Sequence, residues 1–358
     1  MNIKTLVGAV GRNPASVLAA ARALKPGRLF LVHTEGTRHQ AMVLRRQCPV
    51  PRERIHLIPV PAGSGIEQVA GAVADAADWA SVGPVGLDIT GATKVISFGM
   101  WEALRNCLPG GFQALVLDQS SYRLEDASNG RPLPQPMPEI RISEMLAWYG
   151  AEMDSDGTRW QGRLSQLPVA LRRRLPVGQA LLRAFREQGP KFSAERVRKP
   201  VLARALPGPL PSGMRWRENL LHADDPAYLK YNGWLEELCL GMVAGELGER
   251  AGQVFCALGA RLRAGSGQDE MDVVLARGTR VVVVEAKARS SGAGAGADLQ
   301  KRVNKARRFF GQHVRVVFVH PVWGRHPPGA LRDLADDTVT LVGDFDGFGD
   351  RVGSLLGL

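Results

Sequence analysis

The sequence predicts an α/β protein with two domains, each built around its own sheet. In residues 1–150, short β-branched runs alternate with segments of helical period, an order typical of a doubly wound parallel sheet. Towards the C-terminus, a helical segment precedes two apolar strands joined at Gly278-Thr279, and a basic helix and a further strand follow. A chain of 358 residues is long enough to bury two separate cores.

The first domain is expected to follow a β-α-β-α order. Strands are predicted at residues 5–10, 29–33, 55–60, 85–89 and 114–117. Helices are predicted at residues 14–24, 38–47, 65–79 and 93–107. Residues 126–139, rich in proline, glycine and polar groups, are expected to form a loop or the domain edge.

Three polar loops follow predicted strands, where ligands of doubly wound sheets bind. They are residues 11–14 after the first strand, 33–37 after the second and 88–94 after the fourth. The third combines two hydroxyls, a glycine turn, a helix N-terminus and Lys94, which predicts an anion-binding nest. The same residues also fit an ordinary βα turn with a threonine cap. The spacing matches neither a P-loop nor the dinucleotide fingerprint, so a nicotinamide-dependent enzyme is not supported.

Residues 151–227 are expected to form a basic, mostly helical connector broken by prolines. The chain has a net charge of +11, and between Arg159 and Arg217 it carries 14 lysine or arginine residues against two glutamates, a local balance of +12. Such a block is typical of a surface that binds a polyanion. A solvated, arginine-rich surface is the alternative.

Composition and cysteine spacing also indicate the cellular location of the protein. No apolar stretch reaches the length of a membrane span. The four cysteines are widely spaced and lack a metal-ligand pattern, which argues for reduced thiols. We therefore expect a cytoplasmic protein with no membrane partner.

The second domain is expected to begin near residue 228. Its predicted elements are a helix at 234–247, strands around 254–263, a hairpin, a Gly/Ala/Ser loop at 290–297, a basic helix at 298–310 and a strand at 314–320.

The hairpin carries the clearest chemical signal. Glycine at position 278, first in a two-residue loop, predicts a type II′ turn that pairs Arg277 with Arg280. Counting outward places Asp272 opposite Glu285 on the same face of the two strands. Opposed carboxylates destabilise a strand pair by roughly 0.2–1 kcal/mol. A hard divalent cation with oxygen ligands would compensate for that repulsion.

The same register adds two more charged groups to this face. Glu270 falls opposite Lys287, and a lysine beside a metal carboxylate can orient or deprotonate a water. Glu236, in the preceding helix, offers another carboxylate. A solvated hairpin face is the alternative, but the continuous apolar run 281–284 favours a strand buried on both faces. Ionisable groups that end such a strand are costly unless paired or metal-bound.

A glutamate in a first helix, an aspartate in a strand and Glu-x-Lys in the next strand together resemble the PD-(D/E)XK nuclease superfamily. The resemblance implies that Asp272, Glu285 and the backbone carbonyl of Ala286 bind Mg²⁺ or Mn²⁺. It implies that Lys287 positions or activates the attacking water and that Glu236 supports the metal or its water shell. The sequence departs from the pattern in having no proline directly before Asp272.

The basic helix after the hairpin is expected to hold the nucleic-acid strand through phosphate contacts, which position the backbone without reading sequence. Its candidate residues are Gln300, Lys301, Arg302, Lys305, Arg307 and Arg308. Gln300 fits an ordinary surface glutamine at least as well.

Residues 10–14, Val-Gly-Arg-Asn-Pro, and 88–94, Asp-Ile-Thr-Gly-Ala-Thr-Lys, resemble loops of the CARF sensor domains of type III CRISPR systems. The resemblance assigns cyclic-oligoadenylate binding to Gly11, Arg12, Asn13, Pro14, Thr34, Glu35, Asp88, Thr90, Gly91, Ala92, Thr93 and Lys94. Asp88, Ile89 and Ala92 replace the asparagine, leucine and glycine usual in the family.

The order of the two motif sets resembles that of CRISPR ancillary nucleases. It implies a Rossmann-like CARF domain at residues 1–150, the connector at 151–227 and a restriction-endonuclease-like PD-(D/E)XK domain at 228–358. It further implies a homodimer that encloses one cyclic tetra-adenylate and then nicks DNA, or cleaves single-stranded DNA or RNA, with little sequence specificity. Two rivals remain: a ligand-controlled nucleic-acid-binding regulator with an inactive nuclease fold, and a restriction or repair nuclease that needs no activator.

Overall fold

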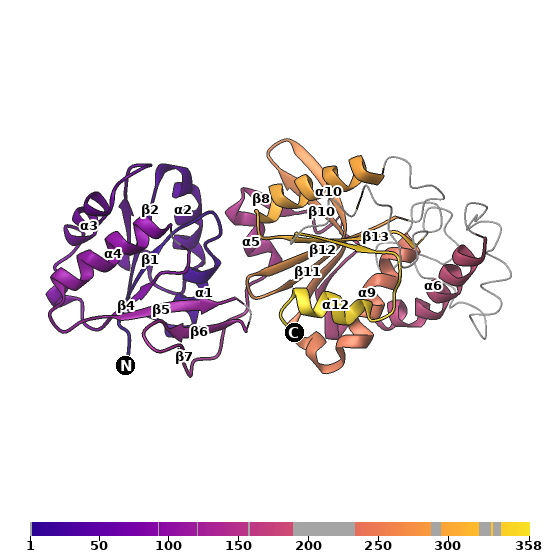
Figure 1. Ribbon diagram of the computed structural model, residues 1–358, viewed down its shortest axis with the longest axis horizontal. Coiled ribbons are helices and arrows are strands. Elements are labelled where there is room, and N and C mark those ends of the chain that lie inside the picture. The colour runs from indigo at the N-terminus through magenta and orange to yellow at the C-terminus, as the bar shows by residue number, and fades with distance from the viewer. Residues whose placement is uncertain are drawn as a thin grey trace. The chain divides into compact units, whose positions relative to one another are not determined.

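The computed structural model describes residues 2–91, 93–119, 121–156, 158–188, 233–287, 295–321, 331 and 338–358. The chain divides into two compact units, Met1–Gly150 and Ala151–Leu358, and each contains a mixed sheet with helices against it (Figure 1). Within the described part of the chain, no helix has both the length and the apolar character needed to cross a membrane.

The sheet of the first unit has the strand order β3-β2-β1-β4-β5-β6-β7. Its strands are β1 (Thr5–Ala9), β2 (Arg28–His33), β3 (Ile55–Pro59), β4 (Val85–Asp88), β5 (Gln113–Asp118), β6 (Arg123–Asp126) and β7 (Arg131–Pro132). Strands β1 to β5 pair in parallel, and β6 and β7 are antiparallel additions at one edge. From β1 the chain continues to β2 and β3 on one side of that strand. It then crosses to β4, which pairs with the other side of β1. The loops after β1 and β4 therefore flank the switch point of the sheet, where ligands of such folds bind.

The described residues of this unit also form α-helices that accompany the sheet. They are α1 (Ala15–Leu24), α2 (Arg38–Gln47), α3 (Ile66–Ala74), α4 (Lys94–Cys107) and α5 (Ile142–Trp148), with 3₁₀ turns η1 (Glu35–Thr37), η2 (Arg52–Arg54) and η3 (Trp79–Ser81). Helices α3 and α4 pack closely: a Cβ on Gly99 would lie 2.5 Å from the Cβ of Val69. Both cover an apolar core formed with β1, β2 and β4. The loop expected at 126–139 contains β7, whose two residues are too few to give a sequence pattern.

The sheet of the second unit has the order β14-β13-β12-β11-β10-β8, and β9 also pairs with β10. Its strands are β8 (Ala151–Met153), β9 (Trp160–Arg163), β10 (Phe255–Ala264), β11 (Gly267–Arg277), β12 (Arg280–Ala286), β13 (Arg315–Val319) and β14 (Val339–Val342). The helices are α6 (Val169–Gln188), α9 (Gly233–Leu247), α10 (Ala295–Phe310) and α12 (Phe348–Leu355), with 3₁₀ turns η4 (Leu164–Gln166) and η6 (Gly248–Gln253). Strands β12, β13 and β14 are parallel, whereas β10, β11 and β12 form an antiparallel meander.

Helices cover both faces of this second sheet. Figure 1 shows α9 and α12 on one face and α10 on the other. The apolar side chains of β11 and β12 that face α9, among them Val273 and Val284, pack in one core with Trp234 and Leu238. The opposite face, under α10, carries the side chains of alternate parity, which include Asp272 and Glu285.

The expected helical connector differs from the structure in its first part. Strands β8 and β9 lie within 151–227, and both pair with β10. They therefore belong to the second sheet, and α6 after them packs against α9. These strands are short, and their mixed polar sequence lacks the alternation that identifies a strand. Residues 189–232, with the expected domain start at 228, and most of the loop expected at 290–297 lie outside the described residues.

Candidate active site and ligand-binding loops

The hairpin of β11 and β12 has the predicted register. Arg277 pairs with Arg280 across the turn, and the ladder continues to the pair formed by Val273 and Val284. Gly278 has φ of 56°, as the first central position of a type II′ turn requires. Continued by one residue, this register places Asp272 opposite Glu285 at the open end of the ladder, and the two are close enough for the charge of Asp272 to help raise the pKa of Glu285.

The two carboxylates lie in a nearly closed environment. Glu285 is 1% exposed and Asp272 is 7% exposed. The Asp272 Oδ2 accepts a hydrogen bond from the backbone N–H of Ala286 at 2.8 Å, and the Nζ of Lys287 lies 3.5 Å from the same oxygen. A guanidinium nitrogen of Arg302, on α10, lies 3.0 Å from the Glu285 Oε2. Each carboxylate therefore has its own basic partner.

Burial sets the protonation of this pair. Desolvation, followed by repulsion from Asp272, raises the pKa of Glu285 to about 8, although Arg302, Lys287 and Lys305 act in the opposite direction. A neutral carboxylic acid relieves like-charge repulsion at the cost of losing an ionic ligand. Binding a divalent cation between the two side chains would stabilise both as carboxylates.

The fit of a metal ion rests on this donor set. Two opposed carboxylates and the Ala286 carbonyl are hard oxygen donors, the class that Mg²⁺ and Mn²⁺ take, and water fills the remaining positions of such ions. Within the described residues, no group of three or more His, Cys, Asp or Glu side chains is arranged around one metal position. Asp272 and Glu285 come together as expected, whereas Glu236 does not join them in one cluster.

Glu236 has a different partner. It lies in the first turn of α9, is buried, and forms an ion pair with Arg159, which precedes β9. A Cβ on Gly259 would lie 2.2 Å from the Arg159 Nε, so glycine at 259 makes room for this arginine. One turn along α9, Cys239 is close enough to Asp272 for its charge to help raise the pKa of the thiol, after the larger effect of burial. The described ion pair of Glu236 is with Arg159.

The pairing of Arg159 with Glu236 was not predicted, because the two residues lie far apart in the chain. The basic character of its surroundings gave no indication of a buried ion pair.

The basic residues of helix α10 have different contacts. Lys305 donates to the carbonyl of Glu270 and lies 3.6 Å from Asp269, so it fastens the helix to β11. Arg308 lies 3.8 Å from a carboxylate oxygen of the same aspartate. The exposed residues of the helix include Gln300, whose amide donates to Asn304, and Lys301.

The loops of the first unit meet at the switch point. A Cβ on Gly11 would lie 2.3 Å from the carbonyl oxygen of Gly91, so the backbones after β1 and β4 are in close contact. A Cβ on Gly91 would in turn lie 3.0 Å from the Oγ of Ser16. A side chain at position 11 would force the two backbones apart, whereas a Cβ at position 91 would need its neighbours to shift by only a few tenths of an ångström. Gly11 is therefore required by backbone packing, whatever else it contacts.

Asp88 lies beneath this contact. Its carboxylate is fully buried and accepts a hydrogen bond from the N–H of Thr90 at 2.9 Å. Burial raises the pKa of Asp88, and the neighbouring Thr90 and Ser16 oppose that shift. The hydroxyl of Thr90 accepts from the N–H of Leu117 at 2.7 Å. Asp88 thus orders the loop from below, while its expected ligand contact stays untested.

The remaining loop residues surround the same edge of the sheet. Thr93 caps α4 by accepting from the N–H of Ile96 at 3.4 Å, and Lys94 is exposed at the first position of that helix. Arg12 and Glu35 are exposed, Asn13, Thr34, Thr90 and Gly91 are partly exposed, and Pro14 is buried. Ala92 lies outside the described residues.

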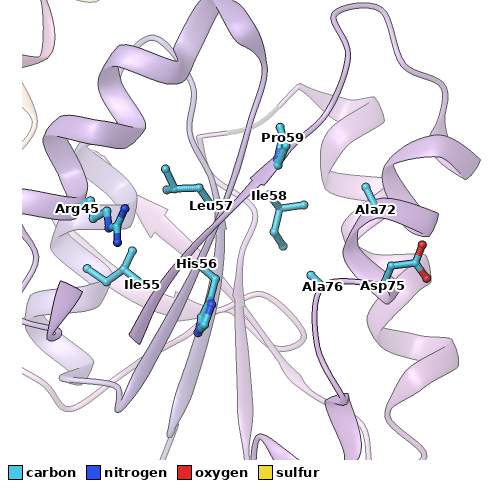
Figure 2. Close-up of a pocket in the computed structure, with 9 residues that line it drawn as sticks. All are labelled: Arg45, Ile55, His56, Leu57, Ile58, Pro59, Ala72, Asp75 and Ala76. Atoms are coloured by element: carbon cyan, nitrogen blue, oxygen red, sulfur yellow. The ribbon is translucent and has the colours of Figure 1, made fainter. Parts of the chain in front are cut away.

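A cavity of about 470 Å³ lies elsewhere in the first unit, beside the edge strand β3 (Figure 2). It is lined by Arg45, Ile55, His56, Leu57, Ile58, Pro59, Ala72, Asp75 and Ala76. Because β3 is two strands away from β1, this cavity is separate from the loops at the switch point.

Comparison with known proteins gives structural matches only. No protein-family model and no curated protein matches the chain. Can2 from Sulfobacillus thermosulfidooxidans in complex with cyclic tetra-adenylate is similar over 99% of this chain and 97% of its own, with a TM-score of 0.66 and 15% identity. Protein VC1899 from Vibrio cholerae is similar over 98% of this chain and 97% of its own, with a TM-score of 0.67 and 16% identity.

A type III CRISPR defence DNA nuclease activated by cyclic oligoadenylate is also similar. The match covers 95% of this chain but 48% of that one, with a TM-score of 0.61 and 17% identity. At these identities the comparison shows the fold. The expected fold class is confirmed at this level: the chain has the two-unit α/β fold of these structures, with a mixed sheet in each unit.

Proposed function

We propose that this protein is a metal-dependent nuclease that cyclic tetra-adenylate switches on, acting in type III CRISPR defence. The observation that carries the proposal is the buried, opposed pair of Asp272 and Glu285, with Lys287 beside it and the basic helix α10 above it. The fold supports it further, since one similar structure contains cyclic tetra-adenylate and another is a DNA nuclease activated by cyclic oligoadenylate.

Each group of residues at this site has its own proposed role in the reaction. Asp272, Glu285 and the Ala286 carbonyl would hold Mg²⁺ or Mn²⁺, which when bound supplies Lewis acidity and lowers the pKa of a coordinated water. Lys287, 3.5 Å from Asp272, orients the attacking water and counters charge that develops on the phosphate. Exposed basic residues on α10 hold the strand through its phosphates, so sequence is not read.

The first unit would receive the activator. The joined loops after β1 and β4, with the exposed Arg12 and Lys94, offer backbone donors and positive charge to an oligonucleotide phosphate. An isologous dimer suits a ligand with rotational symmetry. Helix α4, which starts at this loop, exposes Val95, Phe98 and Trp101 along one side, an apolar surface that would suit a second copy. Activation then requires that the ligand bind the active arrangement more tightly than the idle one.

The test incubates supercoiled plasmid, single-stranded DNA and RNA with the protein and Mn²⁺, with and without cyclic tetra-adenylate. We expect cleavage only with the nucleotide, and a loss of at least a hundredfold with Glu285→Ala. Cleavage that ignores the nucleotide would favour an activator-independent nuclease. Nucleotide-dependent binding to nucleic acid without any cleavage would favour the inactive regulator.

A further inference from the structure

The ion pair of Arg302 with Glu285 occupies the place where the proposed metal ion would be held. Glu285 is almost fully buried, whereas the side chain of Arg302 is 26% exposed and so keeps a path to solvent. The guanidinium approaches to 3.0 Å, which makes it the closest described positive group to this carboxylate. Lys287 instead contacts Asp272.

A divalent cation and the Arg302 guanidinium cannot both occupy the same position beside the Glu285 carboxylate. The cation brings two positive charges to the carboxylate, and the fixed positive charge of Arg302 would repel it. A long side chain with an exposed part can swing away from such a site, while the buried carboxylate on β12 cannot.

We propose that Arg302 is the resident counter-ion of Glu285, that a divalent cation displaces it, and that the freed guanidinium then binds a phosphate of the nucleic-acid strand. The inference rests on the proposed function, because it concerns the same site. It goes further because it assigns Arg302 two successive partners, first Glu285 and then a phosphate. Guanidinium pairs with carboxylate and with phosphate through the same fork of N–H donors, so no other chemistry is needed.

This exchange couples metal binding to substrate binding. In the metal-free protein the guanidinium is held against Glu285 and is not available to phosphate. Once displaced, it lies near the middle of α10 beside the metal position, where the strand must pass to be cut. Metal binding therefore raises the affinity for a polyanion by more than the charge of the ion alone.

The first experiment measures binding of Mn²⁺ alone by calorimetry, without nucleic acid and without turnover. A unit charge roughly 6 Å from a divalent ion changes its affinity by about tenfold even with water-like screening. We expect Arg302→Gln to bind Mn²⁺ about tenfold more tightly than the wild type. Arg302→Lys keeps the charge and should stay near the wild-type affinity. Arg308→Gln, which removes a charge of the same helix that contacts Asp269 instead, should not differ from the wild type.

The second experiment measures binding of a cleavage-resistant phosphorothioate single strand with and without Mn²⁺. Wild-type affinity should rise when Mn²⁺ is added, and Arg302→Gln should lose about tenfold of that rise. If wild-type protein binds Mn²⁺ but Arg302→Gln binds it no more tightly, the exchange is refuted and the metal site stands. If neither protein binds Mn²⁺, the exchange and the proposed metal site both fail.

Discussion

Replacing Gly11 with alanine tests whether the joined loops form the activator site. The added Cβ would lie 2.3 Å from the Gly91 carbonyl oxygen, about 1 Å closer than ordinary contact allows. Both partners are backbone, so no side chain can move aside, and the loops after β1 and β4 must separate. Overpacking of this kind costs about 1–3 kcal/mol.

That cost should appear mainly as lost affinity for the nucleotide, since the loops must close again to bind it. Each 1.4 kcal/mol corresponds to a factor of about ten, so we expect cyclic tetra-adenylate to bind roughly 5–150-fold more weakly. The assay is calorimetric titration of the nucleotide, with thermal unfolding recorded in parallel.

Gly36→Ala is the matched control, because it lies in the neighbouring loop after β2 and its Cβ would meet no atom closer than 3.8 Å. Nuclease activity of Gly11→Ala should return at saturating nucleotide. If Gly11→Ala binds the nucleotide as tightly as Gly36→Ala does, the loops after β1 and β4 are not the binding site.

Three further outcomes follow from contacts in the two units. Burial raises the pKa of Glu285 to about 8, above its unfolded value, so the metal-free wild type should lose stability as pH rises from about 4.5 to 8. Glu285→Gln should lack that loss, so in the presence of chelator it should be more stable than the wild type at pH 8, measured by urea unfolding. If the stability of the two proteins depends on pH in the same way, the raised pKa is contradicted. Phe98→Glu should dissociate the proposed dimer in sedimentation, whereas Val169→Glu, at an equally exposed apolar position of the second unit, should not; an intact dimer would exclude the α4 surface. Arg159→Gln leaves Glu236 buried without its ion-pair partner and should cost about 3–5 kcal/mol in unfolding free energy, and a loss below 1 kcal/mol would show that the pair is not a structural one.

Sequence reasoning succeeded where local geometry decides the structure. A glycine at the first position of a two-residue turn sets the pairing of every residue behind it, so the opposition of Asp272 and Glu285 could be predicted. The alternation of strands and helices likewise predicted the parallel sheet of the first unit, because each element carries its own period.

The rest depends on contacts between distant residues. No local pattern indicates that Arg159 pairs with Glu236, or that Arg302 reaches Glu285. No local pattern shows that the Asp88 side chain is fully buried and accepts a hydrogen bond from the N–H of Thr90 in its own loop, and its ligand contact stays a prediction. Whether a polar side chain at a strand end points into solvent or under its own loop is decided by packing.

Strands β8 and β9 determine how the second unit can be prepared by itself. A fragment that starts at residue 228, where the sequence places the domain, would lack both strands and leave one side of β10 with unpaired backbone groups. Such an uncovered edge invites pairing between molecules and precipitation during expression. It would also lack Arg159. A fragment that starts at Ala151 retains all the described strands of this sheet, and it is the piece on which the proposed activity should be assayed without the first unit.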